Sequence, residues 1–366
     1  MSTTDGSAGM TASAATGSIR VAVDAMGGDH GASEVVPGAL EYARANPADR
    51  VILVGDESTV RALASPLPAN VTIVHAGSVI GMDEHPALAL REKKDSSILV
   101  ATDLVRKGEA DAVVTAGHTG AGMAAAVLKL GRLRGVDRPA LAVQMVRSGR
   151  PLVLLDIGAN PDSSAENLAQ YARMGAIFSE QVLGVGRPRV ALLSIGEEKG
   201  KGDLRIQRAT ELLDGADLNF TGNVEGRDIT RDAADVIVCD AVIGNVVIKF
   251  FEGLSGFIFD LFRAEFGGSL RGKIAYVLMK PGIARIREVF DYEKVGGSPL
   301  LGVRGTVIIT HGSAKRRMVH HAVRVAAATA RGRVPERIAA ALGAGVRDDA
   351  GSAAETDLAP STETTP

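Results

Sequence analysis

Two glycines close to a carboxylate form the stretch of this chain whose residue types are best suited to chemistry. The apolar run at 21–23 ends in Asp24, and Gly27 and Gly28 follow shortly after it. Ligands bind outside the carboxyl ends of parallel strands, and glycine lets backbone N–H groups approach an anion closely. The stretch therefore predicts a phosphate-sized site. The alternative interpretation is a tight turn that leads into a capped helix.

Glycine turns recur after other apolar runs, with small polar residues in or near them. They read A-G-H-T-G at 116–120, I-G-A-N at 157–160 and I-G-E-E at 195–198. Turns between strands and helices favour glycine for structural reasons alone, which would explain any one of them. Because parallel strands end at one edge of a sheet, we expect these turns to share a site with Gly27 and Gly28. The uncharged candidate ligands are Thr119, Gly120, Asn160, Asn223 and Asn245.

Few titratable side chains are placed for catalysis. His118, in a glycine turn, and His311, in H-G-S, are the histidine candidates for proton transfer, with helix capping or packing as the alternative. Lys199 and Lys201 lie in a charged loop that either reaches a phosphate or is only solvated. Cys239 follows an apolar run, as core cysteines do, and we expect no covalent role for it.

Composition and motifs exclude several classes of protein. The net charge of −2 gives no general attraction to nucleic acid, and we expect no nucleic-acid partner. The single cysteine excludes a disulfide framework and suits a reducing cytoplasm. No P-loop, dinucleotide fingerprint or metalloprotease motif is present, so neither a cofactor nor a metal is expected. Because no run of ~18 uninterrupted apolar residues occurs, we do not expect an integral membrane protein.

A parallel-rich α/β fold is needed to position these residues. Short apolar runs alternate with helical segments along most of the chain, which is typical of a Rossmann-like sheet flanked by helices. We expect one α/β domain over 19–345, with disordered tails at 1–18 and 346–366. The predicted strands cover 21–23, 51–55, 71–75, 112–115, 152–157, 189–195, a short segment near 219, 235–239 and 306–310.

Residues 246–290 break this alternation and predict a helical hairpin. On its first helix, apolar residues are spaced 4, 3, 4 and 3 apart, as in a coiled-coil seam, and we expect this seam to pair two copies of the chain. Pro281 should bend or interrupt the return helix, which is predicted over 273–290. The seam residues are Val247, Phe251, Leu254, Ile258 and Leu261.

The return helix also carries a basic and apolar surface. From Phe266 to Arg287 the chain has no acidic residue. That composition suits either an anionic membrane surface or an acidic carrier protein, and a packed hairpin with solvated flanks is the third interpretation. The contact residues that we predict are Arg271, Lys273, Ile274, Leu278 and Lys280.

Nine motifs in a fixed order closely resemble the bacterial phosphate acyltransferases, the PlsX family, over about residues 19–330. His118 stands where that family usually has asparagine. The motifs are D-A-M-G-G-D at 24–29, A-G-x-T-G-A at 116–121, D-I-G-A-N at 156–160, L-S-I-G-E-E-K-G-K-G at 193–202, N-F-T-G-N-V-E-G-R-D at 219–228, V-C-D at 238–240, G-N-V at 244–246, G-G-S-P-L-L-G at 296–302 and H-G-S at 311–313.

The resemblance implies a fold like that of isocitrate and isopropylmalate dehydrogenases and transfer of a fatty acyl group from acyl carrier protein to inorganic phosphate. It also implies a cytoplasmic homodimer that touches the inner face of the membrane, where a membrane acyltransferase consumes the acyl phosphate. The expected catalytic residues are Asp24, His118, Asn160 and Lys199. The expected substrate-binding residues are Gly27, Gly28, Thr119, Gly120, Lys201, Asn223 and Asn245.

Three other functions stay open at this point. A phosphotransacetylase-like enzyme would use acyl-CoA in place of the carrier protein. A decarboxylating hydroxyacid dehydrogenase of similar architecture would need NAD and a metal. A lipid-responsive binding module would bind its ligand without turnover.

Overall fold

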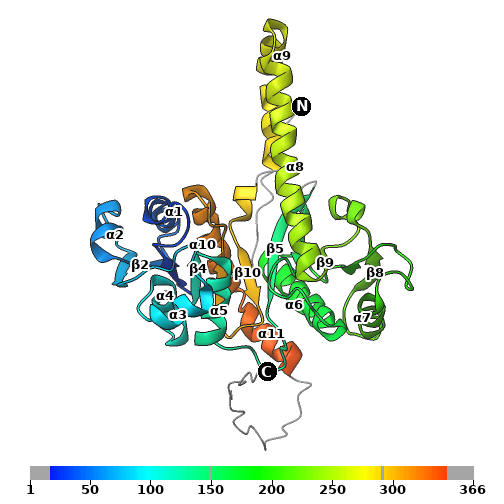
Figure 1. Ribbon diagram of the computed structural model, residues 1–366, viewed down its shortest axis with the longest axis horizontal. Coiled ribbons are helices and arrows are strands. Elements are labelled where there is room, and N and C mark those ends of the chain that lie inside the picture. Colours follow the sequence, from blue (N-terminus) through cyan, green and yellow to red (C-terminus); the bar gives the residue numbers. More distant parts are fainter. Residues whose placement is uncertain (1–16, 148–149, 290–291, 344–366) are drawn as a thin grey trace, which may run out of the picture.

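The computed structural model describes residues 17–147, 150–289 and 292–343, and its centre is an eleven-stranded sheet. Helices cover both faces of the sheet, and a long helical hairpin projects away from its middle (Figure 1). The tails expected at 1–18 and 346–366 lie outside the described residues, apart from residues 17 and 18.

The first half of the sheet contains parallel strands in the order β3-β2-β1-β4-β11. The short apolar runs of β1, β4 and β11 are buried throughout or nearly so, as expected for parallel strands covered by helices on both faces. The strands are β1 (Arg20–Asp24), β2 (Arg50–Gly55), β3 (Val71–His75), β4 (Ala112–Thr115) and β11 (Thr306–Ile309).

The second half contains parallel strands in the order β6-β9-β7-β8, and two antiparallel strands join the halves. These joining strands, β10 and β5, were not predicted from the sequence, because β10 is short and β5 has no helix between it and β6. The strands are β5 (Ala140–Arg147), β6 (Arg150–Leu155), β7 (Val190–Leu193), β8 (Phe220–Val224), β9 (Val236–Val238) and β10 (Ser298–Leu301).

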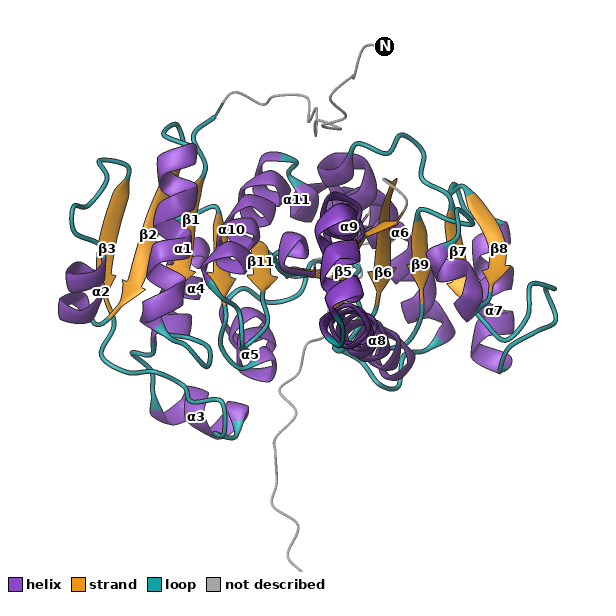
Figure 2. Cartoon of the chain, turned by 90° about the horizontal axis from the view of Figure 1, so that it is seen from above, coloured by secondary structure: helices purple, strands orange, loops and turns teal. Residues whose placement is uncertain are grey.

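Helices pack on both faces, and Tyr171, Met174 and Phe178 of α6 are fully buried in the core. Helices α3, α5 and α8, which follow β3, β4 and β9, lie on one side of the molecule in Figure 2. The carboxyl ends of both halves therefore face that side. The helices of the body are α1 (Ala32–Ala45), α2 (Glu57–Leu63), α3 (Pro86–Glu92), α4 (Ser97–Arg106), α5 (Thr119–Lys129), α6 (Ala165–Leu183), α7 (Leu204–Asp214), α10 (Arg316–Arg331) and α11 (Val334–Gly343), with 3-10 turns η1 (Gly226–Thr230) and η2 (Tyr292–Val295).

The predicted helical hairpin is present as α8 (Ala241–Gly267) and α9 (Leu270–Val289). Asp240 caps α8 by accepting a hydrogen bond from the Ile243 N–H group at 3.0 Å. Of the two expected effects of Pro281, an interruption of the return helix is wrong, because α9 continues through this residue. Helix α9 packs against α8, and the ring centroids of Phe266 and Tyr276 lie 6.1 Å apart.

The apolar surface of the hairpin differs in register from the predicted seam. Val247, Phe251 and Ile258 are half-buried, whereas Phe250 and Phe257 are 68% and 60% exposed. The exposed stripe therefore runs along Val246, Phe250, Leu254, Phe257 and Leu261. Among the described helices, α8 alone has the length and apolar composition that a membrane crossing requires, although no uninterrupted apolar run was found in the sequence.

Candidate functional site

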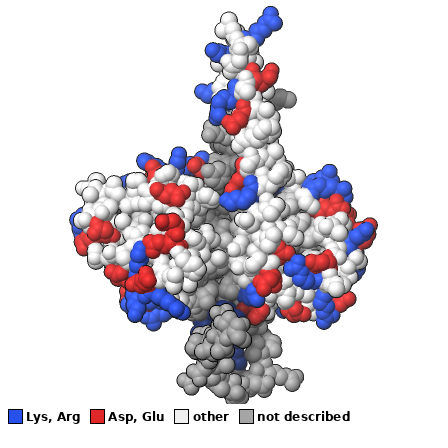
Figure 3. All heavy atoms as spheres, in the orientation of Figure 1, with Lys and Arg blue, Asp and Glu red and all other residues white. Residues whose placement is uncertain are grey.

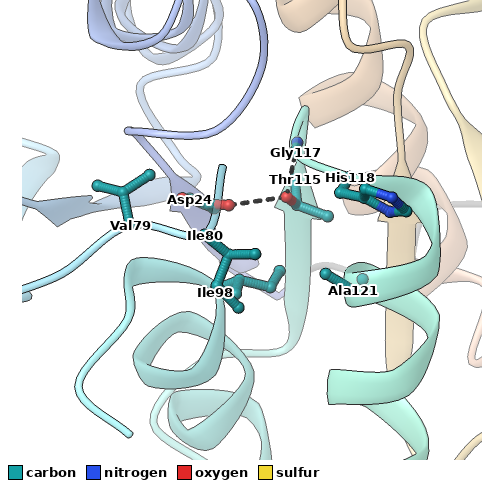
Figure 4. Close-up of a pocket in the computed structure, with 9 residues that line it drawn as sticks. Asp24, Val79, Ile80, Ile98, Thr115, Gly117, His118 and Ala121 are labelled. Carbon is teal, nitrogen blue, oxygen red and sulfur yellow. Dashed lines mark hydrogen bonds between the residues drawn. The ribbon is translucent and has the colours of Figure 1, made fainter. Parts of the chain in front are cut away.

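The carboxyl ends of β1, β4 and β11 lie side by side and form the floor of the candidate site. The register pairs Asp24 of β1 with Thr115 of β4. The Thr115 hydroxyl donates to the Asp24 carboxylate at 2.7 Å and accepts from the Gly117 N–H group at 3.0 Å (Figure 4). Asp24, predicted as a site residue, therefore holds the turn that follows β4.

Burial controls the ionisation of Asp24, which is 2% exposed. Desolvation raises the pKa of its carboxyl group, while hydrogen bonds from the Ser97 and Thr115 hydroxyls act in the opposite direction. A buried carboxylate with hydroxyl partners is suited to orienting neighbouring donors.

Three glycine turns, which contain Gly27 and Gly28, Gly117, and Gly312, pack against one another at this floor. A Cβ atom on Gly27 would lie 2.7 Å from the Gly117 nitrogen. Gly28 has φ +90°, and a Cβ atom there would lie 2.8 Å from the carbonyl oxygen of Gly312. That same oxygen accepts a hydrogen bond from the Asp29 N–H group at 2.8 Å. Both glycines are thus required by packing, so Gly28→Ala would disturb the turn whether or not phosphate binds there.

His118 caps the helix that starts beside these turns. Its Nδ1 atom accepts a hydrogen bond from the Gly120 N–H group at 3.0 Å, so the capping role predicted as an alternative is confirmed. Thr119 follows in the exposed first turn of α5. Helix α1 is preceded by Gly31 at its N-cap position, which provides no side-chain cap. Two helix N-termini, which favour anions, therefore follow directly from the glycine turns.

A lysine that the sequence analysis missed reaches the same turns from the base of α8. The Lys249 ammonium group lies 3.2 Å from Nε2 of His311, and it also pairs with Glu252 at 2.8 Å. Nδ1 of His311 lies 2.8 Å from the Ser313 hydroxyl. Asn245 is exposed one helical turn before Lys249. That spacing along one helix, next to the G-N-V motif, is the signal in the sequence that would have found Lys249.

Asn160 lies in a separate network at the end of β6. Its amide nitrogen donates to Pro139 O at 2.6 Å and to Asp156 Oδ2 at 2.9 Å. Asp156 also accepts from the backbone N–H groups of Leu141, Gly158, Ala159 and Asn160. Burial raises the pKa of Asp156, and these hydrogen bonds oppose the increase. Since β11, β10 and β5 lie between β4 and β6, the described contacts of Asn160 do not join it to Gly27.

The remaining predicted ligands lie toward the far edge of the second half. Lys199 pairs with Asp214 of α7 at 2.7 Å, and Lys201 is exposed on the same loop. The Asn223 side chain donates to the Glu198 carbonyl oxygen at 3.2 Å and so holds this loop. The structure therefore does not bring these three residues to the Asp24 floor.

Two chemical alternatives can be assessed on the described residues. Cys239 is 1% exposed, and burial raises the pKa of its thiol well above the ordinary value, so it is not placed as a nucleophile. Among residues 17–147, 150–289 and 292–343, no group of three or more His, Cys, Asp or Glu side chains is arranged to hold a metal ion.

Solved structures share this fold. A phosphotransacetylase from Streptococcus pyogenes superposes with a TM-score of 0.58 at 17% identity, covering 86% of this chain and 94% of its own. The EutD phosphotransacetylase from Staphylococcus aureus gives a TM-score of 0.56 at 17% identity, with the same coverage of 86% and 94%. At this level of identity the likeness concerns the α/β architecture alone, and it confirms the predicted fold class.

Sequence relatives are much closer. Residues 19–337 match the family described as "Fatty acid synthesis protein". The phosphate acyltransferase of Desulfitobacterium hafniense (strain Y51) is 49% identical over 311 residues, which cover 84% of this chain and 92% of the relative. That of Brevibacillus brevis is 46% identical over 307 residues, covering 83% and 92%. The nine motifs, the family match and these relatives agree, and the chain belongs to the phosphate acyltransferase, or PlsX, family.

Proposed function

We propose that this protein transfers a fatty acyl group from the thioester of acyl carrier protein to inorganic phosphate. A phosphate oxygen attacks the thioester carbonyl carbon, the carbon–sulfur bond breaks, and the thiolate leaves and takes up a proton. The products are acyl phosphate and free carrier protein. Acyl transfer to phosphate follows from the family, and the carrier protein as donor is supported by the resemblance of the motifs.

The observation that carries the proposal is the meeting of three glycine turns, two helix N-termini and a lysine–histidine pair at the ends of β1, β4 and β11. Backbone N–H groups and helix N-termini stabilise the phosphate and the oxyanion that forms during attack. Lys249 and His311 add positive charge or hydrogen bonds on the side of α8. No activated side chain is needed, because phosphate is itself the nucleophile and the site has only to hold it against the thioester.

The direct test measures thiol release when the purified protein is mixed with an acyl carrier protein thioester and phosphate. Lys249→Met should raise the phosphate concentration needed for half-maximal rate by about tenfold, as expected for loss of one charge-assisted contact. Lys199→Met is the matched control, because Lys199 pairs with Asp214 away from the floor. If Lys199→Met alone changes the phosphate requirement, the phosphate lies near β7 and our placement is wrong.

An acyl-CoA donor is the second candidate, and the architecture shared with phosphotransacetylases favours it. The two donors are separated by comparing kcat/KM for the same acyl group carried by the carrier protein and by coenzyme A. We expect the carrier protein to be preferred. A protein that binds acyl chains but releases no thiol from either donor would instead be a binding module.

The hairpin extends the proposal to partners and location. We propose a cytoplasmic homodimer formed along the exposed apolar stripe of α8, which is too apolar for a solvated surface. The end of the hairpin carries basic residues beside exposed apolar ones, and Figure 3 shows Lys and Arg there together with some acidic residues. This composition supports peripheral contact with an anionic membrane, where a membrane acyltransferase would consume the product. The contact residues remain Arg271, Lys273, Ile274, Leu278 and Lys280.

A further inference from the structure

Helix α8 begins in the second half of the sheet but carries Lys249 to the first half. Its N-cap residue, Asp240, follows β9, whereas His311, which the Lys249 ammonium group meets, follows β11. Strands β10, β5 and β6 lie between β11 and β9 in the sheet. The contact between Lys249 and His311 therefore depends on how the start of α8, residues 240–244, is held.

The start of α8 is fixed against the loop that follows β6. The Ala241 N–H group donates to the Asn160 carbonyl oxygen at 3.2 Å. A Cβ atom on Gly244 would overlap the Asp156 carbonyl oxygen and would lie 2.9 Å from Ile157 Cα. Glycine is unfavourable inside a helix, so this close approach is the physical reason for a glycine here. Any larger residue at this position would push α8 away from the end of β6.

An arginine of α7 is bonded to the same segment. The Arg205 Nη2 atom lies 3.2 Å from Asp240 Oδ2, and its Nη1 atom donates to the Ser163 carbonyl oxygen at 3.3 Å. Asp240 is 7% exposed, and its other carboxylate oxygen accepts the capping hydrogen bond from Ile243. Arg205 also pairs with Asp203, the cap of α7, at 2.7 Å. Arg205 thus connects α7, the loop before α6 and the cap of α8.

The length of helix between these contacts and Lys249 makes the attachment important. Lys249 lies about 14 Å along the axis from Asp240, at about 1.5 Å of rise per residue. A small tilt at the start of α8 is therefore enough to move Lys249 Nζ out of hydrogen-bond distance from His311, which is 3.2 Å in the structure. The hydrogen bonds of Arg205 and the backbone atoms nearest Gly244 belong to the second half, so both residues act on the candidate site through α8.

We propose that Arg205 and Gly244 are positioning residues, which set the direction of α8 so that Lys249 reaches the glycine turns of the other half. The inference rests on the proposed function, in which Lys249 contributes to phosphate binding. It gives the motifs D-I-G-A-N at 156–160 and V-C-D at 238–240 a role in the candidate site although both follow strands of the second half.

The test compares substitutions at these positions with matched controls on the same helices. Gly244→Ala should raise the phosphate concentration needed for half-maximal rate by up to about tenfold, the change expected from loss of the Lys249 contact itself. Gly256→Ala is the control, because Gly256 is exposed on α8 and no atom lies within 4 Å of its Cβ position. Both variants gain helix propensity, so their difference reports the close approach to Asp156.

Arg205 gives a second variant that leaves the packing of α8 intact. Arg205→Met removes the contacts with Asp240 and Ser163 and should raise the phosphate requirement by about threefold, as expected for a partly exposed ion pair. Arg205→Lys keeps the charge and should have a smaller effect. Arg208→Met is the control, because Arg208 is 58% exposed on α7 and pairs with Glu211. Should Gly244→Ala not fold, the Arg205 variants decide alone.

Coupling to Lys249 separates positioning from a general loss of structure. In a protein that already carries Lys249→Met, neither Gly244→Ala nor Arg205→Met should raise the phosphate requirement further. If their effects multiply with that of Lys249→Met, the two residues do not act through the lysine and the inference fails. It also fails if both variants keep the phosphate requirement of the wild type.

A measurement without substrate separates this inference from the proposed reaction. In protein with isotope-labelled histidine, the NMR signal of the His311 ring is identified by its loss in His311→Gln. Lys249→Met should shift this signal, Gly244→Ala and Arg205→Met should shift it in the same direction, and the two control variants should leave it in place. If these shifts occur but no donor supports thiol release, the positioning of Lys249 stands and the proposed reaction fails. Turnover with an unmoved His311 signal in both positioning variants overturns the inference alone.

Discussion

Two buried aspartates at strand ends show how differently single residues contribute to this molecule. Asp156 is fully buried and is surrounded by backbone N–H groups and the Asn160 amide, so its role is to shape a turn. Asp24 has fewer donors, two hydroxyl groups among them, and it lines a small hollow beside the glycine turns. Similar burial thus serves a structural network in one half of the sheet and the candidate site in the other.

Asp24→Asn should change how stability depends on pH. Burial raises the pKa of Asp24 above its ordinary value of 3.8, so the folded state binds this proton more tightly than the unfolded state. The wild-type protein therefore loses stability relative to the variant as pH rises from about 3.8 through the folded-state pKa. Urea unfolding at a series of pH values measures the difference. An unfolding free-energy difference that stays constant with pH would contradict this prediction.

Asp56→Asn provides a control of opposite sign for that experiment. Asp56 caps α2, and hydrogen bonds from Ser58 and Thr59 lower the pKa of its carboxyl group to about 2. Its contribution to stability is present above the ordinary value of 3.8 and is lost as pH falls toward about 2. The difference in unfolding free energy between wild type and variant should therefore change with pH in opposite directions for Asp24→Asn and Asp56→Asn.

Cys239→Ala should keep most of the acyl transfer activity, because the buried thiol is protonated and phosphate attacks directly. Steady-state rates of variant and wild type provide the comparison. Mass spectrometry of the protein quenched during turnover supplies the critical result, since an acyl group attached to Cys239 or to any other residue would overturn direct attack.

Among single residues, the sequence predicts correctly that some candidate residues lie close together, and wrongly that others join them. Asp24, Gly27, Gly28 and His118 follow strands that are adjacent in the sheet, so grouping them by motif succeeds. Lys199 and Asn160 follow strands of the other half, and the order of strands in a sheet cannot be obtained from their order in the chain. For Lys249 the sequence offers only its spacing of one helical turn from Asn245, and the course of α8 is needed to show that it meets His311.

Secondary-structure elements show the same division between local and non-local information. The apolar runs predict the parallel strands because each is buried on both faces, and the hairpin follows from its helical periodicity. Strand β10 was not predicted because it has only four residues, Ser298–Leu301, and one of its two neighbours, β5, is distant in sequence. The register of the hairpin also depends on which face of α8 meets α9, which periodicity alone leaves undecided.

An acidic residue on the exposed stripe of α8 should separate the proposed dimer. Phe257→Asp places a charge at a position that is 60% exposed in the single chain, and Leu254→Asp does the same one turn earlier. Both variants should give the mass of a monomer in light scattering. Arg263→Asp is the matched control, because this side chain is 79% exposed and lies off the stripe. Dimers that persist in both stripe variants would move the interface away from α8.

In the whole molecule, the candidate site lies next to a long helical hairpin. Lys249 meets His311 near the start of the hairpin, whose other end lies far from the sheet (Figure 1). One end of α8 therefore touches the candidate site, while the turn between α8 and α9 can reach a surface that the body does not touch. If the hairpin end binds a membrane as proposed, the acyl phosphate would be released close to a membrane that the candidate site does not enter.

Acidic substitutions at the hairpin end should weaken binding to vesicles without stopping turnover measured in their absence. Basic residues near anionic lipid contribute about 1 kcal/mol each, so binding should rise with anionic lipid and fall with salt. Ile274→Asp and Leu278→Asp remove apolar contacts at positions 57% and 77% exposed. Leu128→Asp, on the body and 65% exposed, is the control in vesicle sedimentation.

The opposite pattern would identify another partner for the hairpin end. If Ile274→Asp and Leu278→Asp bind vesicles normally but lose affinity for acyl carrier protein, the basic and apolar surface is a protein-docking site. In that case the membrane assignment is wrong, and the acidic carrier protein takes its place.

Strands β10 and β11 lie at the middle of the sheet although the ribosome makes them after every other described strand. Until residues beyond 298 emerge, β4 and β5 lack the partners that join the two halves, and α10 is not yet present to cover β1 and β4. Unpaired edges and uncovered apolar faces invite aggregation. The nascent chain therefore exposes unpaired strand edges and apolar faces until β10, β11 and α10 have been made. During this time we expect it to depend on chaperones at the ribosome exit.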